Sequence, residues 1–234
     1  MAKIALMIFG PPGSGKGTQA NLAAGKLNLI HFDTGRYLRE YLYDLANKNN
    51  KMVKSERQLN EAGELNTSAF TARIVINEVT KIAKAGYGVV FSGSPRTLYE
   101  AEKLLPILSR LYGRNKLTLV ELRVHPNTSL KRNSNRILCN FCELTILKTL
   151  LPHPNHLKIC PFCGSKFKKR TDDNPKIINV RLKEYNERTK PIFNFLKTIG
   201  FRVREINGEP TPHKVSTQVL KAVGYSVNNS RKKR

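Results

Sequence analysis

The feature that most constrains the fold is a glycine-rich turn between an apolar run and a helical pattern. Residues 4–9 form a continuous apolar run, which is typical of a strand buried on both faces of a parallel sheet. Residues 10–18 follow with the sequence Gly-Pro-Pro-Gly-Ser-Gly-Lys-Gly-Thr, and apolar residues with helical spacing continue to Leu27. Glycines let several backbone N–H groups converge on one anion, and the start of a helix adds its positive dipole end. The turn therefore predicts a phosphate-binding loop. The alternative is a flexible glycine turn that binds nothing.

Two side chains of this loop have the chemistry that a nucleotide needs. Lys16 can reach the outer phosphates, and Thr18 supplies a hydroxyl one position later than usual because Gly17 intervenes. The residues predicted to hold the phosphates of the nucleotide that donates the phosphoryl group are Gly13, Ser14, Gly15, Lys16, Gly17 and Thr18.

Strand and helix patterns alternate along the rest of the chain. Further strands are predicted at 30–32, 89–91, 117–124 and 201–206. Helices are predicted at 101–111, at 179–199 with a kink at Pro191, and at 215–223. This alternation predicts parallel βαβ units, and so an α/β fold with a parallel sheet flanked by helices. Together with the phosphate-binding loop after the first strand, it indicates the P-loop NTPase class.

Length and hydropathy limit the class of protein further. A chain of 234 residues fits one domain with an insertion, or two small domains. The longest apolar run has six residues, whereas a membrane span needs about 20 and a signal-peptide core about 7–15. We therefore expect a cytoplasmic protein that does not enter the membrane.

The charge balance is unusual. The chain has 41 Lys and Arg against 17 Asp and Glu, a net charge of +24, and it ends in a basic cluster at 231–234. Such a surface attracts polyanions, so weak nonspecific association with nucleic acid is one interpretation. A solvated basic surface with no such partner is the other.

Four cysteines lie in two pairs within a segment of little periodicity, residues 135–172. Cys139 and Cys142 form the first pair, and Cys160 and Cys163 form the second after 17 intervening residues. Two such pairs in a cytosolic chain are typical of a tetrahedral four-thiolate zinc site, with iron as the alternative metal and free thiols or disulfides as the alternatives to metal. A structural Zn²⁺ is expected because no ligand position stays open. His153 and His156 lie nearby as possible competing ligands.

The loop resembles that of the adenylate kinase family, within the nucleoside monophosphate kinases, and further segments extend the resemblance along nearly the whole chain. These segments are Thr-Gly-Arg-Tyr-Leu-Arg at 34–39, Gly-Glu-Leu-Asn at 63–66, Gly-Ser-Pro-Arg-Thr at 93–97, Arg-Thr-Asp-Asp at 170–173 and Asn-Gly-Glu at 207–209. Some members of the family carry a zinc-bearing lid where the cysteine pairs lie here. The resemblance implies reversible transfer of the γ-phosphoryl group of ATP, bound with Mg²⁺, to a nucleoside monophosphate, AMP above others.

The resemblance also implies which residues act. The ATP-binding set would be the loop residues with Arg132, Arg136, Thr145, Ile146 and Glu209. The AMP-binding set would be Thr34, Arg39, Glu64, Leu65, Asn66, Gly93, Ser94, Pro95, Arg96, Glu100, Arg170 and Arg181. The catalytic set would be Lys16, Arg96, Arg136, Arg170 and Arg181. Arginine suits this chemistry because guanidinium stays charged and grips phosphate with two parallel hydrogen bonds.

The same resemblance divides the chain into parts. A core would comprise 1–32, 67–134 and 173–225, a monophosphate-binding segment 33–66, a zinc lid 135–172 and a basic tail 226–234. We expect a monomer.

The chain departs from the family pattern near the magnesium and base positions. The family usually has Asp where Arg36 and Ser92 stand, and those acids hold waters around Mg²⁺. It usually has Gln, facing the acceptor base, where Glu100 stands. Ser94 replaces a Phe. An ionised Glu100 accepts only, which matches the two adjacent donors of guanine better than the pairing edge of adenine. A kinase for another monophosphate, GMP first, and a catalytically weak nucleotide- and RNA-binding paralogue are therefore the alternatives.

Overall fold

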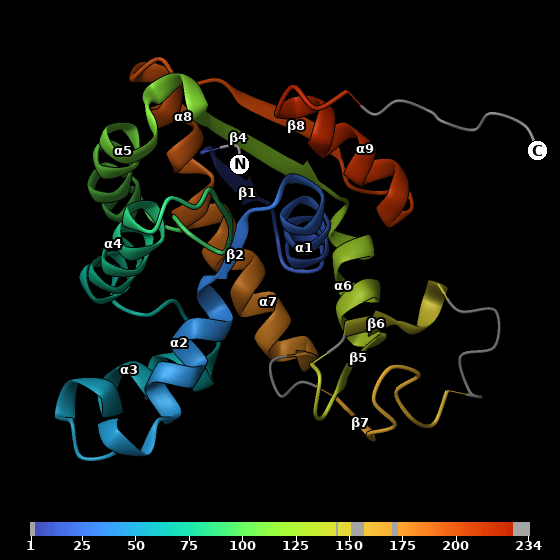
Figure 1. Cartoon of the computed structure of the whole chain (residues 1–234). Coiled ribbons are helices and arrows are strands. Elements are labelled where there is room, and N and C mark those ends of the chain that lie inside the picture. The colour runs from blue at the N-terminus through green and yellow to red at the C-terminus, as the bar shows by residue number, and fades with distance from the viewer. Residues whose placement is uncertain (1–2, 144, 151–156, 170–172, 227–234) are drawn as a thin grey trace, which may run out of the picture.

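The computed structural model describes residues 3–143, 145–150, 157–169 and 173–226. Its centre is a sheet of five parallel strands in the order β2-β3-β1-β4-β8 (Figure 1). The strands are β1 (Ala5–Phe9), β2 (Ile30–Asp33), β3 (Val89–Ser92), β4 (Leu117–Arg123) and β8 (Val203–Asn207). The predicted α/β fold with a parallel sheet is confirmed.

Helices cover both faces of the sheet, which explains the uninterrupted apolar run in β1. Ala5, Met7 and Phe9 face one core, and Leu6 and Ile8 face the other. The first core is closed by α4 (Ser68–Lys84), α5 (Leu98–Tyr112) and α8 (Pro191–Thr198). The second is closed by α1 (Lys16–Leu27) and α9 (Pro212–Ala222).

Two arms extend from the same end of this body (Figure 1). The helical arm comprises α2 (Thr34–Tyr43), the 3₁₀ turn η1 (Leu45–Asn47) and α3 (Lys51–Ala62). Asp33 and Asn50 cap the two α-helices, accepting from backbone N–H groups of the first turn. Leu38, Leu42 and Val53 of this arm pack with residues of α4 in a third, small core.

The cysteine arm is a three-stranded antiparallel sheet in the order β6-β5-β7. Its elements are β5 (Arg136–Cys139), β6 (Thr145–Leu147), the 3₁₀ turn η3 (Lys148–Leu150) and β7 (Phe167–Lys168). The chain enters it from α6 (Pro126–Ser134) and leaves it into α7 (Pro175–Glu184). A further 3₁₀ turn, η2 (Arg114–Lys116), joins α5 to β4.

One predicted helix differs in detail from the structure. The pattern at 179–199 predicts one helix kinked at Pro191, whereas α7 already begins at Pro175 and passes into a π-helical turn, η5 (Tyr185–Thr189), before α8. Pro191 stands in the first turn of α8, where its missing N–H costs nothing. The interruption therefore precedes the proline.

Among the described residues, no helix is long and apolar enough to cross a membrane.

Candidate active site and metal centre

The phosphate loop lies between β1 and α1, as the sequence predicts. A Cβ at Gly13 would stand 2.7 Å from Asn133 Nδ2 and 2.8 Å from the Ser129 carbonyl oxygen, and its φ of +75° is left-handed. Only glycine therefore lets the loop pack against α6. Lys16 Nζ donates to the carbonyl oxygens of Gly10 at 2.6 Å and Pro11 at 2.8 Å. Its ammonium is thus held at the loop.

The predicted arginines converge on this ammonium. Burial lowers the pKa of Lys16 well below its usual value, and the positive charges of Arg96, Arg181 and Arg136 lower that pKa further. The carboxylate of Asp33 acts in the opposite direction. These arginines come from the turn after β3, from α7 and from β5, so only the fold brings them together. The combined positive charge around Lys16 attracts an anion, and phosphate is the natural one.

The acceptor side of the loop is formed by the helical arm and the turn after β3. A Cβ at Gly35 would lie 3.7 Å from both Arg39 Nη1 and Arg96 Nη2, so these two guanidinium groups face the same space. Thr34 is 2 % exposed, and its hydroxyl has no hydrogen-bond partner among the described residues. A buried hydroxyl beside two arginines suits a bound oxyanion.

A cavity of about 80 Å³ adjoins this group. Its lining includes Lys16, Arg96, Arg181 and Leu65 together with the turn Gly93, Ser94 and Pro95. The cavity thus joins residues predicted for the donor with residues predicted for the acceptor.

The far end of the donor site is held by Arg132. Its guanidinium donates to the carbonyl oxygens of Gly208 and Glu209, each at 2.9 Å. Glu209 Oε1 in turn accepts from the backbone N–H of His125 at 2.7 Å. Arg132 and Glu209, both predicted for the donor side, therefore lie together.

The cysteine arm is fastened at its base. Arg136, where the chain enters the arm, forms a two-pronged ion pair with Asp173, where the chain leaves it, with Nε to Oδ2 at 3.0 Å. Both side chains are largely buried. Sequence reasoning placed Asp173 in a motif without a role, and the pairing depends on contacts between distant segments.

At position 92, a serine that contacts His31 stands where the family pattern has an acid. Its hydroxyl lies 2.6 Å from His31 Nε2, and His31 Nδ1 lies 2.6 Å from Asn21 Oδ1. Burial lowers the pKa of His31, which favours the neutral ring. A neutral ring that donates from Nδ1 to Asn21 accepts the Ser92 hydroxyl at Nε2. His31 and Asn21 carried no sequence motif.

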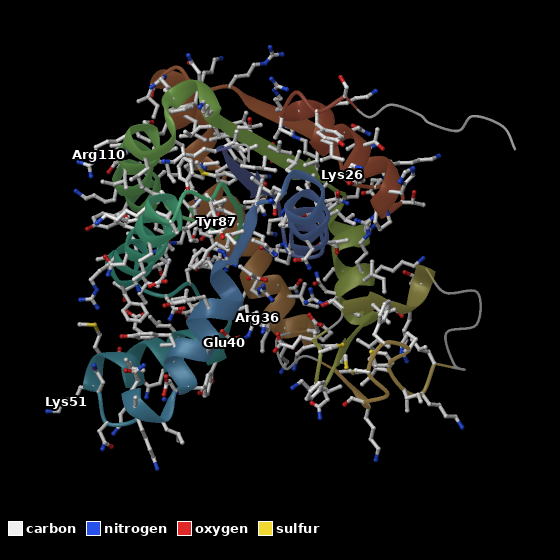
Figure 2. All side chains as sticks on the ribbon, in the orientation of Figure 1. Lys26, Arg36, Glu40, Lys51, Tyr87 and Arg110 are labelled. Carbon is white, nitrogen blue, oxygen red and sulfur yellow. The ribbon has the colours of Figure 1, made fainter. Side chains whose placement is uncertain are left out.

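Arg36, the second departure, pairs with acids of both arms. Its Nε lies 2.8 Å from Glu40 Oε1 and 3.0 Å from Glu143 Oε2 of the cysteine arm. Figure 2 shows Arg36 on α2 at the side of the helical arm that faces the cysteine arm. The substitution thus introduces a contact between the two arms.

Two residues assigned to the acceptor base have their polar groups engaged in local structure. Glu100 is 3 % exposed, and its carboxylate accepts from the backbone N–H of Arg96 at 2.8 Å and from the Thr97 hydroxyl at 3.3 Å. Asn66 donates to the carbonyl and the carboxylate of Glu56 at 2.7 and 3.0 Å. Burial raises the pKa of Glu100. Base reading by these residues stays a prediction, and the contacts support a capping role for Glu100.

The remaining predicted residues are less central. Glu64 is exposed, and Thr145 and Ile146 lie on β6 of the cysteine arm. Arg170 lies outside the described residues, as do His153 and His156.

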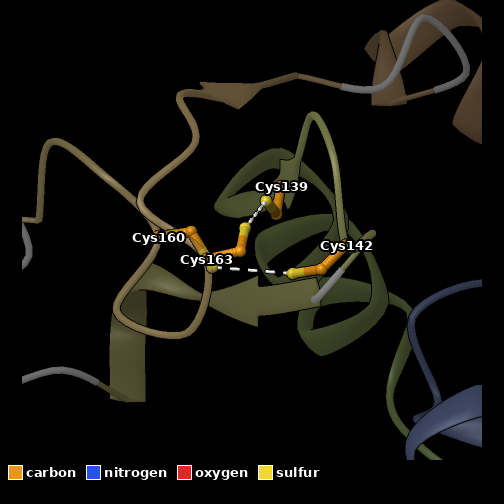
Figure 3. A group of neighbouring side chains, drawn as sticks. All are labelled: Cys139, Cys142, Cys160 and Cys163. Atoms are coloured by element: carbon orange, nitrogen blue, oxygen red, sulfur yellow. Dashed lines mark hydrogen bonds between the residues drawn. The ribbon is translucent and has the colours of Figure 1, made fainter.

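The four cysteines form one cluster, with their side chains pointing toward one another (Figure 3). Cys139 Sγ lies 3.4 Å from Cys163 Sγ, Cys142 Sγ lies 3.6 Å from Cys160 Sγ, and all four sulfurs are within 4.8 Å of one another. A disulfide needs about 2.05 Å, whereas four thiolates about 2.3 Å from one zinc stand about 3.8 Å apart. The cluster therefore fits a tetrahedral metal site.

The environment of Cys139 favours the ligating thiolate form. Burial alone would raise the pKa of this thiol, but backbone N–H groups of Phe141 and Cys142 donate to its sulfur and lower the pKa to about 6.

Comparison with known proteins decides the family. A sequence model of the adenylate kinase family matches residues 8–201. The chain belongs to the adenylate kinase family. It is 31% identical over 222 residues to the adenylate kinase of Paracoccus denitrificans, covering 94% of this chain and 97% of that protein. It is 34% identical over 215 residues to that of Lactobacillus acidophilus (91% and 94%) and 31% identical over 217 residues to that of Chlamydia pneumoniae (93% and 96%). The predicted family, the adenylate kinases, and the predicted enzyme class, the phosphotransferases, are both confirmed.

Proposed function

We propose that this chain transfers the γ-phosphoryl group of ATP reversibly to AMP. The observation that supports this most is that Arg96 and Arg181 line one cavity with Lys16 of the phosphate loop, while the charge of Arg136 also acts on the Lys16 ammonium. Phosphoryl transfer needs little covalent help from protein, because positioning two anions in line and neutralising their charge supplies most of the catalysis. An enzyme of this family with such a cluster has what the reaction requires.

The donor and the acceptor would occupy opposite sides of Lys16. The loop N–H groups and Lys16 would bind the β- and γ-phosphates of ATP. Arg132 and the Gly208–Glu209 turn would lie beside the adenine base of ATP. Thr34, Arg39 and Arg96 would hold the acceptor phosphate. Arg136 and Arg181 would neutralise the charge of the group in transfer. Closure of the helical arm and the cysteine arm over this space would exclude water and so prevent hydrolysis of ATP.

AMP is favoured over GMP by the contacts of Glu100. The GMP alternative requires this carboxylate to face the acceptor base, whereas its oxygens bond to the Arg96 N–H and to the Thr97 hydroxyl. We further propose that the protein acts as a monomer, which sedimentation equilibrium would test.

Mg²⁺ bound with ATP supplies charge neutralisation between the phosphates. The hard oxygen donors that suit this ion are the Thr18 hydroxyl and the carboxylate of Asp33, whose charge acts on Lys16. We propose that Asp33 is the one acid that orients the hydrated ion, since Ser92 and Arg36 replace two others. Ser92→Asp should lower the Mg²⁺ concentration for half-maximal rate, and it should tighten Mn²⁺ binding to the enzyme–ATP complex. An unchanged or higher Mg²⁺ requirement would contradict this organisation.

A coupled assay with ATP and each of AMP, GMP, CMP and UMP tests the main proposal. We expect the highest kcat/KM with AMP. Arg96→Gln and Arg181→Gln should each lower kcat/KM by about 10²–10³-fold, the usual loss for one preorganised donor to a transition-state oxyanion.

Arg110→Gln is the matched control, because Arg110 is an exposed arginine on α5 away from the loop (Figure 2). It should keep full activity. Absence of turnover with every monophosphate, with ATP binding retained, would instead support a catalytically weak nucleotide-binding protein.

A further inference from the structure

The turns that carry the cysteines place two aromatic rings in solvent. Phe141 directly precedes Cys142, and Phe162 directly precedes Cys163, so both turns carry phenylalanine at the same position. Each phenylalanine is 79% exposed, and Ile159 nearby is 56% exposed. A large exposed apolar group is informative when several gather in a small segment, because such a patch marks a contact surface.

Backbone pairing joins the two turns that carry these side chains. The hairpin 159–166 has Phe162 in its turn, with Ile159 bridged to Lys166 and the Cys160 N–H donating to Ser165 at 2.8 Å. The first cysteine turn joins the same hairpin, because the Asn140 N–H donates to the carbonyl oxygen of Lys166 at 2.9 Å.

The charged residues of this segment are mostly lysines. Residues 137–169 include five lysines and one acidic residue, Glu143. The carboxylate of Glu143 lies 3.0 Å from Arg36 Nε, so that single negative charge is already paired. Lys158, Lys166 and Lys168 are exposed beside the aromatic turns.

We propose that this surface binds single-stranded nucleic acid. We call it the aromatic–lysine surface, and it consists of Phe141, Lys158, Ile159, Phe162, Lys166 and Lys168. Exposed rings stack on bases of any sequence, and lysines neutralise the phosphates between them. A neutral apolar protein partner would match the apolar side chains but leave the lysines unused, whereas a duplex would satisfy the lysines and hide its bases. Only an unpaired strand uses both features. The proposal does not rest on phosphoryl transfer.

Fluorescence anisotropy with a labelled RNA strand of about 12 nucleotides tests the proposal, with DNA of the same sequence and the RNA duplex as further probes. Twelve nucleotides lie within the ~4–16 that one stacking surface spans. We expect both single strands to bind the full-length, metal-loaded protein more tightly than the duplex. Phe141→Ala with Phe162→Ala should weaken single-strand binding at least about 5-fold, since one stacked base contributes about 1–3 kcal/mol. The slope of log K against log salt should not change.

Substitution of the lysines should change the salt dependence of binding, which substitution of the phenylalanines leaves unchanged. Lys166→Gln with Lys168→Gln should lower the salt slope by about 0.7 for each phosphate that the protein no longer neutralises. Tyr99→Ala, an exposed aromatic on α5, and Lys48→Gln with Lys51→Gln in the helical arm are the matched controls. These should leave the preference for single strands intact. Phe141→Tyr with Phe162→Tyr should restore binding, because a phenol ring stacks as well.

Metal content and phosphoryl transfer, measured on each variant, show whether the arm remains folded, since only the backbone of Phe141, and not the ring of Phe141 or Phe162, contacts a cysteine. Equal affinities of the wild type and the Phe141→Ala, Phe162→Ala variant for the single strand would overturn the proposal and leave only general polyanion attraction. Duplex binding as tight as single-strand binding would overturn it too. So would self-association that depends on both phenylalanines without any binding of oligonucleotide.

Discussion

The two arms beside the phosphate loop are stabilised in different ways. The helical arm buries Leu38, Leu42 and Val53 in a small core shared with α4. The described part of the cysteine arm buries only Ile137 and two of the cysteines, Cys139 and Cys160. Apolar burial therefore accounts for the first arm, whereas the second has too little of it.

The contrast teaches that one chain stabilises its two arms by two different means. An arm with its own core needs nothing from solution, whereas an arm organised by thiolates is folded only while metal is bound. Each arm should respond to a different perturbation, and the predictions below follow that contrast from the largest effect to the smallest.

Removal of one metal ligand should have the largest effect. Cys160→Ser should abolish metal binding, which contributes about 10–16 kcal/mol in small structural zinc domains, and should unfold the cysteine arm. Hydrogen exchange should then show that protection disappears over 136–143 and 157–169 and remains over 34–62. Lys169→Gln, an exposed change in the same arm, is the control.

Elemental analysis of wild-type protein, purified under reducing conditions without chelator, checks the premise. We expect one Zn²⁺ per chain. Less than about half an equivalent of any transition metal would contradict a closed four-thiolate site.

Removal of apolar volume should act on the other arm alone. Leu42 is fully buried in the core of the helical arm, so Leu42→Ala should lower the free energy of unfolding by about 2–5 kcal/mol. Leu45→Ala, at a position 83% exposed, should cost about 0.5 kcal/mol or less. Urea denaturation measures both, and metal content should stay unchanged. Loss of metal in Leu42→Ala would show that the arms are not independent.

Much of this organisation could be predicted from the sequence because it resides in local patterns. The glycine loop, the alternation of strands and helices, the arginine motifs and the cysteine spacing all lie within short windows. The helix α6 escaped prediction because it has little apolar periodicity and buries Ser129 and Asn133 instead. The π-helical turn was missed because its residues continue the helical spacing around them.

The contacts that the sequence could not predict join distant residues. His31 bonds to Ser92, Arg136 to Asp173 and Arg36 to Glu143. None of these pairs leaves a local pattern, because each depends on strand register or on how the arms fold back. The structural roles of Arg36 and Ser92, the two departures from the family pattern, therefore follow only from the residues that they contact in the folded chain.

A smaller effect is expected at Glu100, which lies in neither arm. Because its oxygens cap the start of α5, Glu100→Gln should change the ratio of kcat/KM for AMP to that for GMP by less than about 2-fold. A carboxylate that reads the base would change it by at least about 5-fold, the smallest usual cost of mispairing a buried polar group. Steady-state kinetics with both acceptors decides between the two roles.

The same variant has a pH signature. Burial raises the native pKa of Glu100, so the folded protein binds this proton more tightly than the unfolded chain. The free energy of unfolding should therefore fall as pH rises from the ordinary carboxyl pKa of about 4.3 through the raised native value. The side chain in Glu100→Gln does not titrate in this range, so the variant should lack this part of the dependence of the free energy of unfolding on pH. Urea titrations from acid to neutral pH measure it, and identical slopes would contradict a buried, ionising carboxyl.

The smallest effect belongs to the contact between the arms. Arg36 Nε lies 3.0 Å from Glu143 Oε2, but the side chains are 54% and 39% exposed, so the pair should contribute about 0.2–1 kcal/mol, or up to about 5-fold in the arm-closing equilibrium. Glu143→Gln should raise the KM for ATP within that range, and the difference should shrink at high salt because mobile ions screen exposed charges. Glu40→Gln is the matched control, since Glu40 bonds to the same guanidinium at 2.8 Å but stays within the helical arm. Exchange of the charges in Arg36→Glu with Glu143→Arg should restore the lower KM. Equal effects of Glu40→Gln and Glu143→Gln would mean that Arg36 acts on its own helix, and that the two arms close without this pair.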